Sequence, residues 1–554
     1  MTANNANNVV DAVVVGAGIS GLYAIHRLRK SGLSVRGFER GSDVGGTWFW
    51  NSYPGARVDI ESKFYSYSFD DELQQDWTWS HRYAYQPEIL AYLNHVADRF
   101  GIREHIKFNT AVVAAAWDET HARWNFTTSD GGRITAKYFV NGSGGLSNTN
   151  RPRFSDDDNF AGEIYHSGEW PNDGVDFSGK RVGIIGTGSS GIQMIPLIAK
   201  EAGRLSVFQR TAQYAVPAWN RSMDEAETRE IKDHYPAIRQ RVRESYFGID
   251  FEVPDHGAVE ASPEEVEAQL DFAWKRGGYM MLAAYPDIVL NPESNAIVSD
   301  WVWKKIRPRI KDPKTAEKLR PKYPFGAKRL CVDTEYFEAF NRDNVDLIDL
   351  EEAGIERLVP EGVRLADGNI VELDVLVFAT GFDAMTGALL GMNVTGIRGL
   401  SLSEHWADGP KNFLGIMIAG FPNLFMITGP GSPSAFYNLP PGIEQHVDWI
   451  ATCIDYLIDN SYDYINPTSE FERAWTDHVT WLAQQTIFTK VKSWYNGQNI
   501  EGKPNQFLIY AGGGITYRAF TEQTIAAGGY RGFELGTAAG AAVHPSERLM
   551  VTMA

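Results

Sequence analysis

Two glycine-rich loops, each placed directly after a short apolar run, constrain the fold of this chain more than any other feature. Val9 to Val15 is a β-branched run that ends in Gly16-Ala17-Gly18-Ile19-Ser20-Gly21. Arg181 to Ile185 leads in the same way into Gly186-Thr187-Gly188-Ser189-Ser190-Gly191. In a strand–loop–helix unit such glycines allow a tight turn and bring a pyrophosphate close to the helix N-terminus. The sequence therefore predicts an α/β fold with two Rossmann-like dinucleotide-binding domains.

The residue that follows the second strand of each unit indicates which dinucleotide binds there. The predicted strand Leu33 to Phe38 closes on Glu39, and a carboxylate at this place accepts hydrogen bonds from an unphosphorylated adenosine ribose. The strand Leu205 to Phe208 ends instead in Gln209-Arg210-Thr211. Arginine can bind a 2′-phosphate that a carboxylate would repel, although Arg210 could also be a solvated surface charge. Because a flavin accepts hydride from a nicotinamide, we expect FAD at the first loop and NADPH at the second.

The remaining pattern predicts how the domains are divided. Residues 86–100 read as a helix, and alternating segments over 107–145 suggest a small β insertion. Charged helical segments follow at Asp224 to Arg243, Pro263 to Trp274 and Asp300 to Ile310, and strands resume at Val345 to Ile348, Val363 to Leu365 and Leu373 to Phe378. We predict an FAD domain (1–145 and 384–540), an NADP domain (146–213 and 326–383), a helical subdomain inserted in it (214–325) and a flexible tail (541–554).

Composition excludes several classes of function. The chain has 554 residues, of which 43% are hydrophobic and 22% charged, which is typical of globular proteins. Its formal net charge of −18 argues against nucleic acid and against an anionic membrane surface. We also expect neither a secretory leader nor a membrane span, and no metal site. The two cysteines, Cys331 and Cys453, form no CxxC motif, which argues against a dithiol mechanism and favours the cytoplasm.

The motif Phe160-x-Gly162-x-x-x-His166-x-x-x-Trp170-Pro171 stands directly before the second glycine loop. At this motif, the most specific of several, the chain resembles the Baeyer–Villiger monooxygenase family. The aromatic segment from Gly46-x-Trp48 through Tyr53-Pro54-Gly55 to Asp59 is similar to a second consensus of that family. The resemblance covers roughly Val9 to Leu535. It is closest to the phenylacetone and steroid monooxygenase branch, with features similar to cyclohexanone-type relatives at Phe436 to Pro441; further matches are Lys328-Arg329, Ala379 to Asp383 and Ser493 to Tyr495.

The resemblance implies a reaction in which reduced flavin and dioxygen form a C4a-peroxyflavin that attacks a ketone. The tetrahedral adduct then rearranges to an ester or lactone. The peroxide must stay deprotonated, and Arg329 suits this role because a guanidinium keeps its charge and its protons at working pH. Asp59 resembles the acid that pairs with this arginine and sets its position. NADP+ is expected to stay bound beside the flavin during oxygenation and to exclude water.

The same resemblance assigns the other site residues. The adenosine diphosphate half of FAD is assigned to Gly16, Gly18, Gly21 and Glu39, its flavin side to Thr47, Trp48, Asp59 and Tyr65, and its adenine to the vicinity of Val112. NADP is assigned to Gly186, Thr187, Gly188, Ser189, Ser190, Gly191, Arg210, Thr211, Lys328 and Trp494, with Arg57 near the nicotinamide. The substrate pocket is assigned to Ser434, Ala435, Phe436 and Trp494. Residues Phe160, Gly162, His166 and Trp170 are interpreted as the link between the two domains, with a connecting role for His166.

Two alternatives remain open at this stage. Flavin monooxygenases that oxidise amines or sulfides share both glycine loops, but they usually lack a Trp-Pro ending like Trp170-Pro171. A flavin module that passes electrons to a partner protein would need an added protein acceptor. We expect a ketone and dioxygen as the reaction partners and a monomer or small homo-oligomer. Glu501, where relatives usually have proline, leaves the stiffness of the Trp494 loop open.

Overall fold

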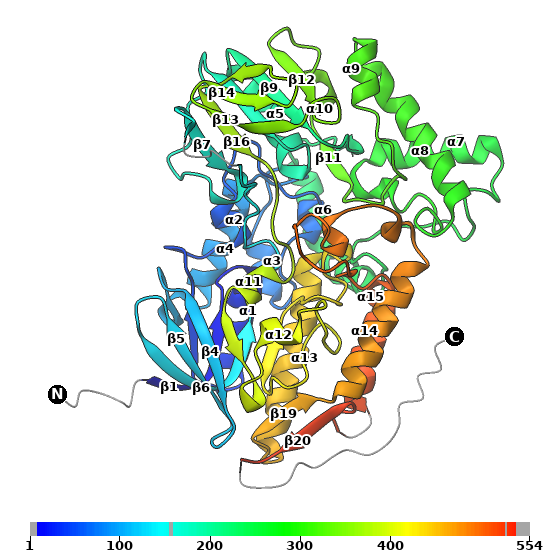
Figure 1. The fold of residues 1–554 in the computed structure, drawn as a ribbon. Helices are drawn as coiled ribbons and strands as arrows, with labels where there is room; N and C mark the ends of the chain where they lie inside the picture. Colours follow the sequence, from blue (N-terminus) through cyan, green and yellow to red (C-terminus); the bar gives the residue numbers. More distant parts are fainter. Residues whose placement is uncertain (1–7, 155–158, 527–528, 539–554) are drawn as a thin grey trace.

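The computed structural model describes residues 8–154, 159–526 and 529–538. A parallel core of strands around β1 (Val9–Val15) forms one half of the molecule, with α1 (Ile19–Lys30) following the first glycine loop (Figure 1). Its sheet has the order β17-β4-β5-β6-β1-β2-β3, and β18 also pairs with β6. The other strands of this sheet are β2 (Val35–Phe38), β3 (Ile106–Lys107), β4 (Val112–Asp118), β5 (Arg123–Thr128), β6 (Arg133–Asn141), β17 (Asn393–Thr395) and β18 (Leu424–Met426).

A second sheet, entirely parallel, lies at the other end of the molecule in Figure 1 and has the order β12-β9-β8-β16-β7. Its central strands are almost completely buried, as expected for parallel strands that are covered on both faces. The prediction of an α/β fold with two Rossmann-like units is confirmed. The strands are β7 (Glu163–His166), β8 (Arg181–Ile185), β9 (Arg204–Gln209), β12 (Val345–Asp349) and β16 (Val375–Phe378), and α5 (Ser189–Glu201) and α10 (Tyr336–Ala339) pack beside them.

Two strands were predicted in the wrong place. We expected β6 in a small β insertion. It pairs in parallel with β1, from Val9 opposite Thr135 to Val15 opposite Asn141, and is therefore a central strand of the first sheet. Residues Val363 to Leu365 were expected in the parallel sheet of the second half. They form β14 (Gly362–Leu365) of a separate antiparallel sheet with β13 (Ile355–Val359) and β15 (Ile370–Glu372). Alternation of apolar residues predicts a strand, but it does not say which neighbour the strand pairs with.

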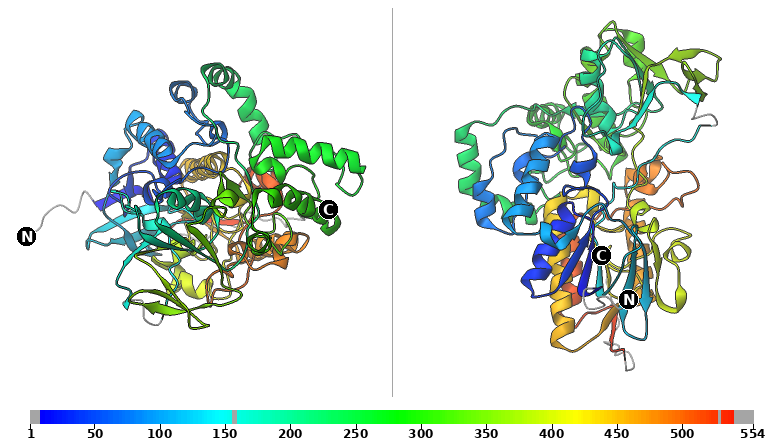
Figure 2. Two further views of the ribbon diagram at one scale, coloured as in Figure 1. Left: turned by 90° about the horizontal axis from the view of Figure 1, so that it is seen from above. Right: turned by 90° about the vertical axis from the view of Figure 1, so that its left-hand side faces the viewer.

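Helices occupy the chain between β10 (Ala215–Pro217) and β11 (Cys331–Asp333), which pair with each other. Seen from above, the green helices α7 and α8 project to one side of the two sheets (Figure 2). The helix expected from Asp300 starts eight residues earlier, because Asn291 caps it by accepting from the Glu293 amide and Pro292 occupies its first position. These helices are α6 (Glu225–Arg243), α7 (Pro263–Arg276), α8 (Pro292–Ile306) and α9 (Pro313–Lys318).

Long helices complete the first half. In α13 (Leu439–Asp459) one face packs against α1, and α14 (Ser469–Gln484) and α15 (Gly513–Ala526) lie beside it (Figure 1). The predicted tail, residues 541–554, lies outside the described residues. Shorter elements are α2 (Thr47–Trp50), α3 (Asp71–Asp76), α4 (Gln86–Arg99), α11 (Gly387–Leu390), α12 (Leu402–His405), β19 (Tyr464–Pro467) and β20 (Phe533–Gly536).

Two chain segments connect the halves and run side by side. The Asn150 amide donates to the Gly381 carbonyl at 2.9 Å, and the Asp383 amide donates to the Asn148 carbonyl at 2.8 Å. Thr149 and Phe382 form an antiparallel bridge between these two bonds. The outgoing and returning connections therefore form one short two-stranded hinge between the two sheets.

Candidate active site

The first glycine loop is shaped for a dinucleotide. A Cβ atom at Gly16 would lie 2.5 Å from the Gly142 carbonyl oxygen, and one at Gly21 would lie 1.8 Å from the Gly16 carbonyl oxygen. Gly18 caps α1 without any side-chain hydrogen bond, so the first amides of this helix are available to an anion. Glu39 is buried and accepts from the Ala17 amide at 2.9 Å and the Gly41 amide at 2.7 Å, which holds its carboxylate beside the loop.

The second loop has the same form. A Cβ at Gly186 would lie 2.5 Å from the Ala379 carbonyl oxygen and one at Gly191 only 2.2 Å from the Gly186 carbonyl oxygen, whereas one at Gly188 would meet nothing within 4 Å. This open space lies at the N-terminus of α5, where the cap again makes no side-chain bond. Ser189 and Ser190 open the helix, and the hydroxyl of Thr187 donates to the Thr211 carbonyl at 3.0 Å.

Two cations face each other at the end of β9. Lys328 lies over the ring of Tyr323 at 4.9 Å, and burial together with the charge of Arg210 lowers the pKa of Lys328. Neither Lys328 nor Arg210 forms an ion pair with a carboxylate within residues 8–154, 159–526 and 529–538. Two adjacent cations without a carboxylate are suited to a phosphate group. This geometry fits the prediction that Arg210 and Lys328 bind a 2′-phosphate.

The aromatic segment after the first loop turns toward the centre of the molecule. The Trp48 indole, in the second residue of α2, donates to the Tyr65 hydroxyl at 3.1 Å. Burial raises the pKa of Tyr65. Arg57 is buried and donates to the Val332 carbonyl at 3.2 Å, but its Nε has no partner in the described structure. A buried unpaired donor of this kind fits a site whose cofactor amide would complete the hydrogen bonds.

Arg329 and Asp59 form an ion pair where the two halves meet. Arg329 donates to Asp59 Oδ2 from Nη2 at 2.8 Å and from Nε at 3.2 Å, and from Nη1 to the Ala435 carbonyl at 2.6 Å. About a quarter of each side chain is exposed. Burial disfavours the charge, but Asp59 outweighs it and raises the pKa of Arg329 above its ordinary value. The guanidinium therefore keeps its charge, and three hydrogen bonds to two acceptors hold it in place.

Tyr279 completes this pair, and we did not predict it. Its hydroxyl donates to Asp59 Oδ2 at 3.1 Å, and its ring lies 4.8 Å from the guanidinium carbon of Arg329. The signal for it in the sequence is the preceding Gly277-Gly278, which ends α7 with φ of 76° and 59°. A Cβ at Gly278 would lie 2.2 Å from the Tyr83 hydroxyl, so glycine is required for the turn that aims Tyr279 inward.

The predicted substrate residues lie next to the arginine. Ser434 to Phe436 form a short 3-10 turn whose Ala435 carbonyl accepts from Arg329. Phe436 packs at 4.8 Å on Tyr495 and at 4.5 Å on Phe488. Trp494 is half-buried and stacks edge-on against Tyr495 at 4.6 Å. Phe488, Trp494 and Tyr495, all from the chain between α14 and α15, therefore form an aromatic wall beside the Arg329–Asp59 pair.

The segment Phe160 to Pro171 is more than a link. Residues Glu163–His166 are the edge strand β7, paired in parallel with β16, so the segment belongs to the second sheet. His166 Nδ1 accepts from the Gly168 amide at 3.0 Å, and its Nε2 is 3.4 Å from the Thr380 hydroxyl. Burial lowers the pKa of His166. The Trp170 amide donates to the Trp50 carbonyl at 3.3 Å, which connects the segment to the FAD half. A Cβ atom at Gly162 would lie 2.4 Å from the Asp374 carbonyl oxygen, so this position has no room for a side chain.

Val112 is the remaining predicted residue, and the structure places it at the start of β4. It is buried in the same apolar cluster as Val15 and Phe38, the residues that precede the first glycine loop and Glu39. Two residues before Val112, the Thr110 amide donates to the Glu39 carbonyl at 2.9 Å, so the start of β4 lies close to Glu39. Whether it contacts an adenine stays a prediction.

Comparison with known proteins shows the family of this chain. A flavin-binding monooxygenase-like family model matches residues 10–228. A Baeyer–Villiger monooxygenase of Pseudooceanicola batsensis is 46% identical over 92% of this chain and 93% of its own length. The chain belongs to the Baeyer–Villiger monooxygenase family. The solved structure of an oxidised steroid monooxygenase bound to NADP superposes with a TM-score of 0.91 at 46% identity, covering 96% of this chain and 100% of that one.

Another relative of this monooxygenase has a different activity in its name. The phenazine N-monooxygenase PhzNO1 of Lysobacter antibioticus is 43% identical over 96% of this chain and 98% of its own length. Sequence similarity at this level therefore does not by itself separate oxygen insertion beside a carbonyl from oxidation of a ring nitrogen. The distinction has to come from the chemistry at Arg329 and from experiment.

The described parts of the chain hold further histidines, cysteines, carboxylates and helices outside this site. No group of three or more His, Cys, Asp or Glu side chains there could hold a metal ion. None of the described helices is both long enough and apolar enough to cross a bilayer. Cys331 and Cys453 are buried free thiols, and burial raises the pKa of Cys331 to about 12. Neither thiol is therefore reactive, because the thiolate is the nucleophile.

Proposed function

We propose that this chain is an FAD- and NADPH-dependent monooxygenase that inserts one oxygen atom of O2 beside the carbonyl of a ketone to give an ester or lactone. The observation that carries the proposal is the Arg329 guanidinium, fixed by Asp59, Tyr279 and the Ala435 carbonyl where the two cofactor halves meet. Membership of the Baeyer–Villiger monooxygenase family supports the same reaction. The proposed substrates are the cyclic, aryl-alkyl or polycyclic ketones expected from the sequence.

Arg329, Asp59 and Tyr279 have separate tasks in this reaction. When bound and reduced, FAD supplies the activation of dioxygen for attack on a carbonyl carbon. Arg329 donates hydrogen bonds to the oxygen atoms at that place and stabilises negative charge without giving up a proton, because its pKa is raised. Asp59 and Tyr279 hold the guanidinium in one orientation, and a fixed donor needs no reorganisation during the reaction.

The cofactors have matching residues on both sides of Arg329. Gly16, Gly18, Gly21 and Glu39 would hold the adenosine diphosphate part of FAD, and Trp48 with Tyr65 its flavin side. The loop from Gly186 to Gly191, with Arg210 and Lys328, would hold NADPH, and Arg57 would donate to the nicotinamide amide. The aromatic residues Phe436, Trp494 and Tyr495 would exclude water once oxidised NADP stays in place.

Incubation with a panel of ketones under labelled oxygen tests the proposal. We expect one labelled oxygen atom in an ester or lactone for each NADPH consumed. In Arg329→Ala, flavin reduction by NADPH should continue while ester formation falls by about a hundredfold or more, the loss typical for removal of a charge-stabilising donor. Ester formation near the original rate in this variant would show that the role assigned to Arg329 is wrong.

N-oxidation is the second candidate, because one relative at 43% identity is named a phenazine N-monooxygenase. Phenazines and tertiary amines therefore belong in the same panel. An electrophilic oxidant attacks amines after it is protonated, whereas Arg329 is suited to keep it deprotonated. Labelled N-oxides without any labelled ester would contradict the ketone proposal and establish N-oxidation. NADPH consumption only with an added protein acceptor would instead indicate a redox module.

We further propose a cytoplasmic enzyme that acts as a monomer or small homo-oligomer. Two buried free cysteines support a reducing compartment, and the charge of −18 gives no support to nucleic-acid or anionic membrane partners. Light scattering during gel filtration, with FAD and NADP+ present, tests the oligomeric state. A particle larger than a tetramer would contradict it.

A further inference from the structure

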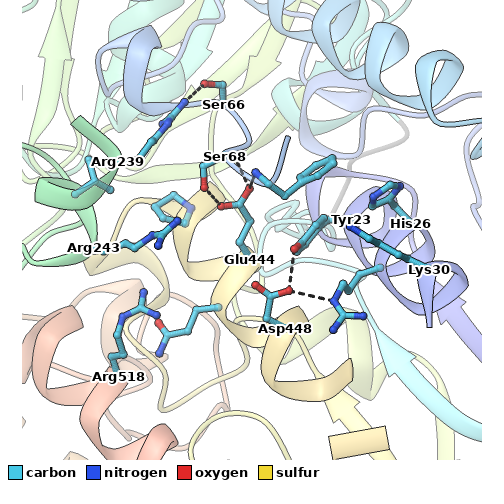
Figure 3. Close-up of a pocket in the computed structure, with 15 residues that line it drawn as sticks. Tyr23, His26, Lys30, Ser66, Ser68, Arg239, Arg243, Glu444, Asp448 and Arg518 are labelled. Carbon is cyan, nitrogen blue, oxygen red and sulfur yellow. Dashed lines mark hydrogen bonds and ion pairs between the residues drawn. The ribbon is translucent and has the colours of Figure 1, made fainter. Parts of the chain in front are cut away.

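A cavity apart from the candidate active site lies between α1, α6, α13, α15 and the turn at residues 66–69 (Figure 3). Its volume is about 360 Å³, and none of the glycine-loop residues or the Arg329–Asp59 pair lines it. Cavities that hold small molecules typically begin at about 300 Å³. The cavity is therefore large enough for a ligand, and nothing in the proposed reaction uses it.

The lining has a positive charge in a strongly acidic protein. With the histidine neutral, the charges add to +3, whereas the whole chain carries −18. Figure 3 shows three of the arginines on one side of the cavity and Lys30 on the opposite side. The charged side chains are five cations and two carboxylates: Arg27, Lys30, Arg239, Arg243, Arg518, Glu444 and Asp448.

Both carboxylates already have hydrogen-bond donors from the protein. Glu444 accepts from the Ser68 amide at 2.5 Å, from the Phe69 amide at 3.1 Å and from the Ser68 hydroxyl. Asp448 accepts from the Tyr23 hydroxyl at 2.8 Å and faces Arg27 at 3.5 Å. Only Arg27 of the five cations is thus paired with a carboxylate in the described structure.

Arg239 is the buried anchor of the cluster. Only 6% of it is exposed, and it donates to three neutral acceptors: Gln74 Oε1 at 2.9 Å, Ser66 Oγ at 2.7 Å and the Tyr67 carbonyl at 3.5 Å. Burial, and to a smaller degree the neighbouring charge of Arg243, oppose its charged form and lower the pKa of Arg239. A buried guanidinium without a carboxylate partner costs free energy that an anion would recover.

We propose that this cavity binds a phosphate-bearing small molecule between Arg239 and Arg243 of α6 and Arg518 of α15. Planar guanidinium groups match the oxygen geometry of phosphate and bind it with paired hydrogen bonds. Because the three arginines come from α6 and α15, an occupied cavity ties α6 to the helices of the FAD half. The site is independent of the proposed monooxygenase reaction, and neither stands or falls with the other.

Calorimetric titration of the FAD-loaded, NADP+-saturated protein tests this site. The probes are inorganic phosphate, pyrophosphate and citrate, each at matched ionic strength, and saturating NADP+ occupies the 2′-phosphate position at Arg210. We expect pyrophosphate to bind with a dissociation constant of about 1 mM or lower. Ligand binding to the folded state should also raise the melting temperature in proportion to the logarithm of its concentration.

Variants of the arginines locate the binding. Arg243→Gln with Arg518→Gln should weaken pyrophosphate binding by about tenfold or more, since charged hydrogen bonds are the strong ones. Arg241→Gln is the matched control, because Arg241 lies on the same helix but is paired with Asp250 at 2.9 Å. Absence of pyrophosphate binding, an unchanged affinity in the double variant, or citrate binding as tightly as pyrophosphate would each overturn the proposal.

Discussion

Tyr279, which the motifs do not include, contacts both members of the Arg329–Asp59 pair. Tyr279 donates to the same Asp59 oxygen that accepts twice from Arg329, and its ring covers the guanidinium. A hydrogen bond to a charged group contributes about 1.5–3 kcal/mol. We regard Tyr279 as a positioning residue, because it acts through Asp59 and Arg329.

Tyr279→Phe should therefore keep the ring and lose the bond to Asp59. We expect the yield of ester per NADPH to fall about tenfold, from the lower end of that energy range, while the Michaelis constant for NADPH stays unchanged. The products are quantified as ester against hydrogen peroxide. Tyr336→Phe is the matched control, since the Tyr336 hydroxyl is buried without a partner in the described structure. Equal coupling in both variants would show that Tyr279 merely fills space.

The two cations at the end of β9 give a prediction on cofactor choice. Arg210→Gln should raise the Michaelis constant for NADPH by about tenfold or more, with little effect on NADH, because only NADPH carries the 2′-phosphate. Arg204→Gln, at the start of the same strand and paired with Asp346 at 2.5 Å, is the control. Steady-state kinetics with both nucleotides decide, and equal effects on NADPH and NADH would argue against the contact.

Lys328 and Arg210 also predict how NADPH binding depends on pH. Burial and Arg210 lower the pKa of Lys328, so Lys328 loses its charge at a lower pH than an ordinary lysine as the pH rises. Binding of NADPH, measured as kcat/KM, should therefore weaken on the alkaline side, and kcat/KM for NADH should not. In Arg210→Gln the repulsion is gone and the decline should move to higher pH. A decline at the same pH in both proteins would assign it to another group.

At the scale of elements, the sequence predicted the units that repeat a known pattern and missed the pairings between distant segments. Both glycine loops and the strands β1, β8 and β16 are local patterns, and they could be read directly. The partner of β6 depends on a strand more than a hundred residues away, and no local alternation encodes it. In the same way Arg329 and Asp59 were found by resemblance, but Tyr279 depends on how α7 ends.

The chain between α14 and α15 connects the aromatic wall to the hinge. Asn499 donates to the Phe382 carbonyl at 2.8 Å, and Lys503 donates to Asp383 Oδ1 at 2.6 Å and to the Ala384 carbonyl at 2.9 Å. The same segment carries Tyr495, which packs on Phe436. A movement of the returning connection would therefore be transmitted to the wall beside Arg329.

Lys503→Gln tests this connection. Removing the charge breaks the bond to Asp383, and only 11% of the lysine side chain is exposed, so solvent screens the pair weakly. We expect faster limited proteolysis after residue 490 and a severalfold larger share of hydrogen peroxide among the products, as water reaches the site. Lys492→Gln, an exposed lysine in the same segment, should change neither. Proteolysis at the original rate would show that the ion pair does not hold the segment.

At the scale of the whole molecule, the two halves must meet in an orientation that allows hydride to pass from one dinucleotide to the other. Gln193 of α5 holds the irregular segment of the FAD half with its entire amide group. Its Oε1 accepts from the Tyr53 hydroxyl at 2.9 Å and from the Arg57 amide at 3.3 Å, and its Nε2 donates to the Arg57 carbonyl at 3.1 Å. Gln193 is 5% exposed, so water does not replace these bonds.

Gln193→Leu should slow flavin reduction by NADPH about tenfold, because three bonds of about 0.5–1.5 kcal/mol each no longer fix the approach of the two cofactors. Reduction by dithionite, which needs no nicotinamide, should keep its rate. Gln193→Glu is the graded comparison, since it keeps an acceptor for Tyr53 and the Arg57 amide while a carboxyl group replaces the amide that donates to the Arg57 carbonyl. Stopped-flow absorbance of the flavin measures both reductions. If Gln193→Leu lowered the melting temperature and left the NADPH-driven rate intact, these bonds would stabilise the interface without orienting the cofactors, and the timing of hydride transfer would lie in the hinge alone.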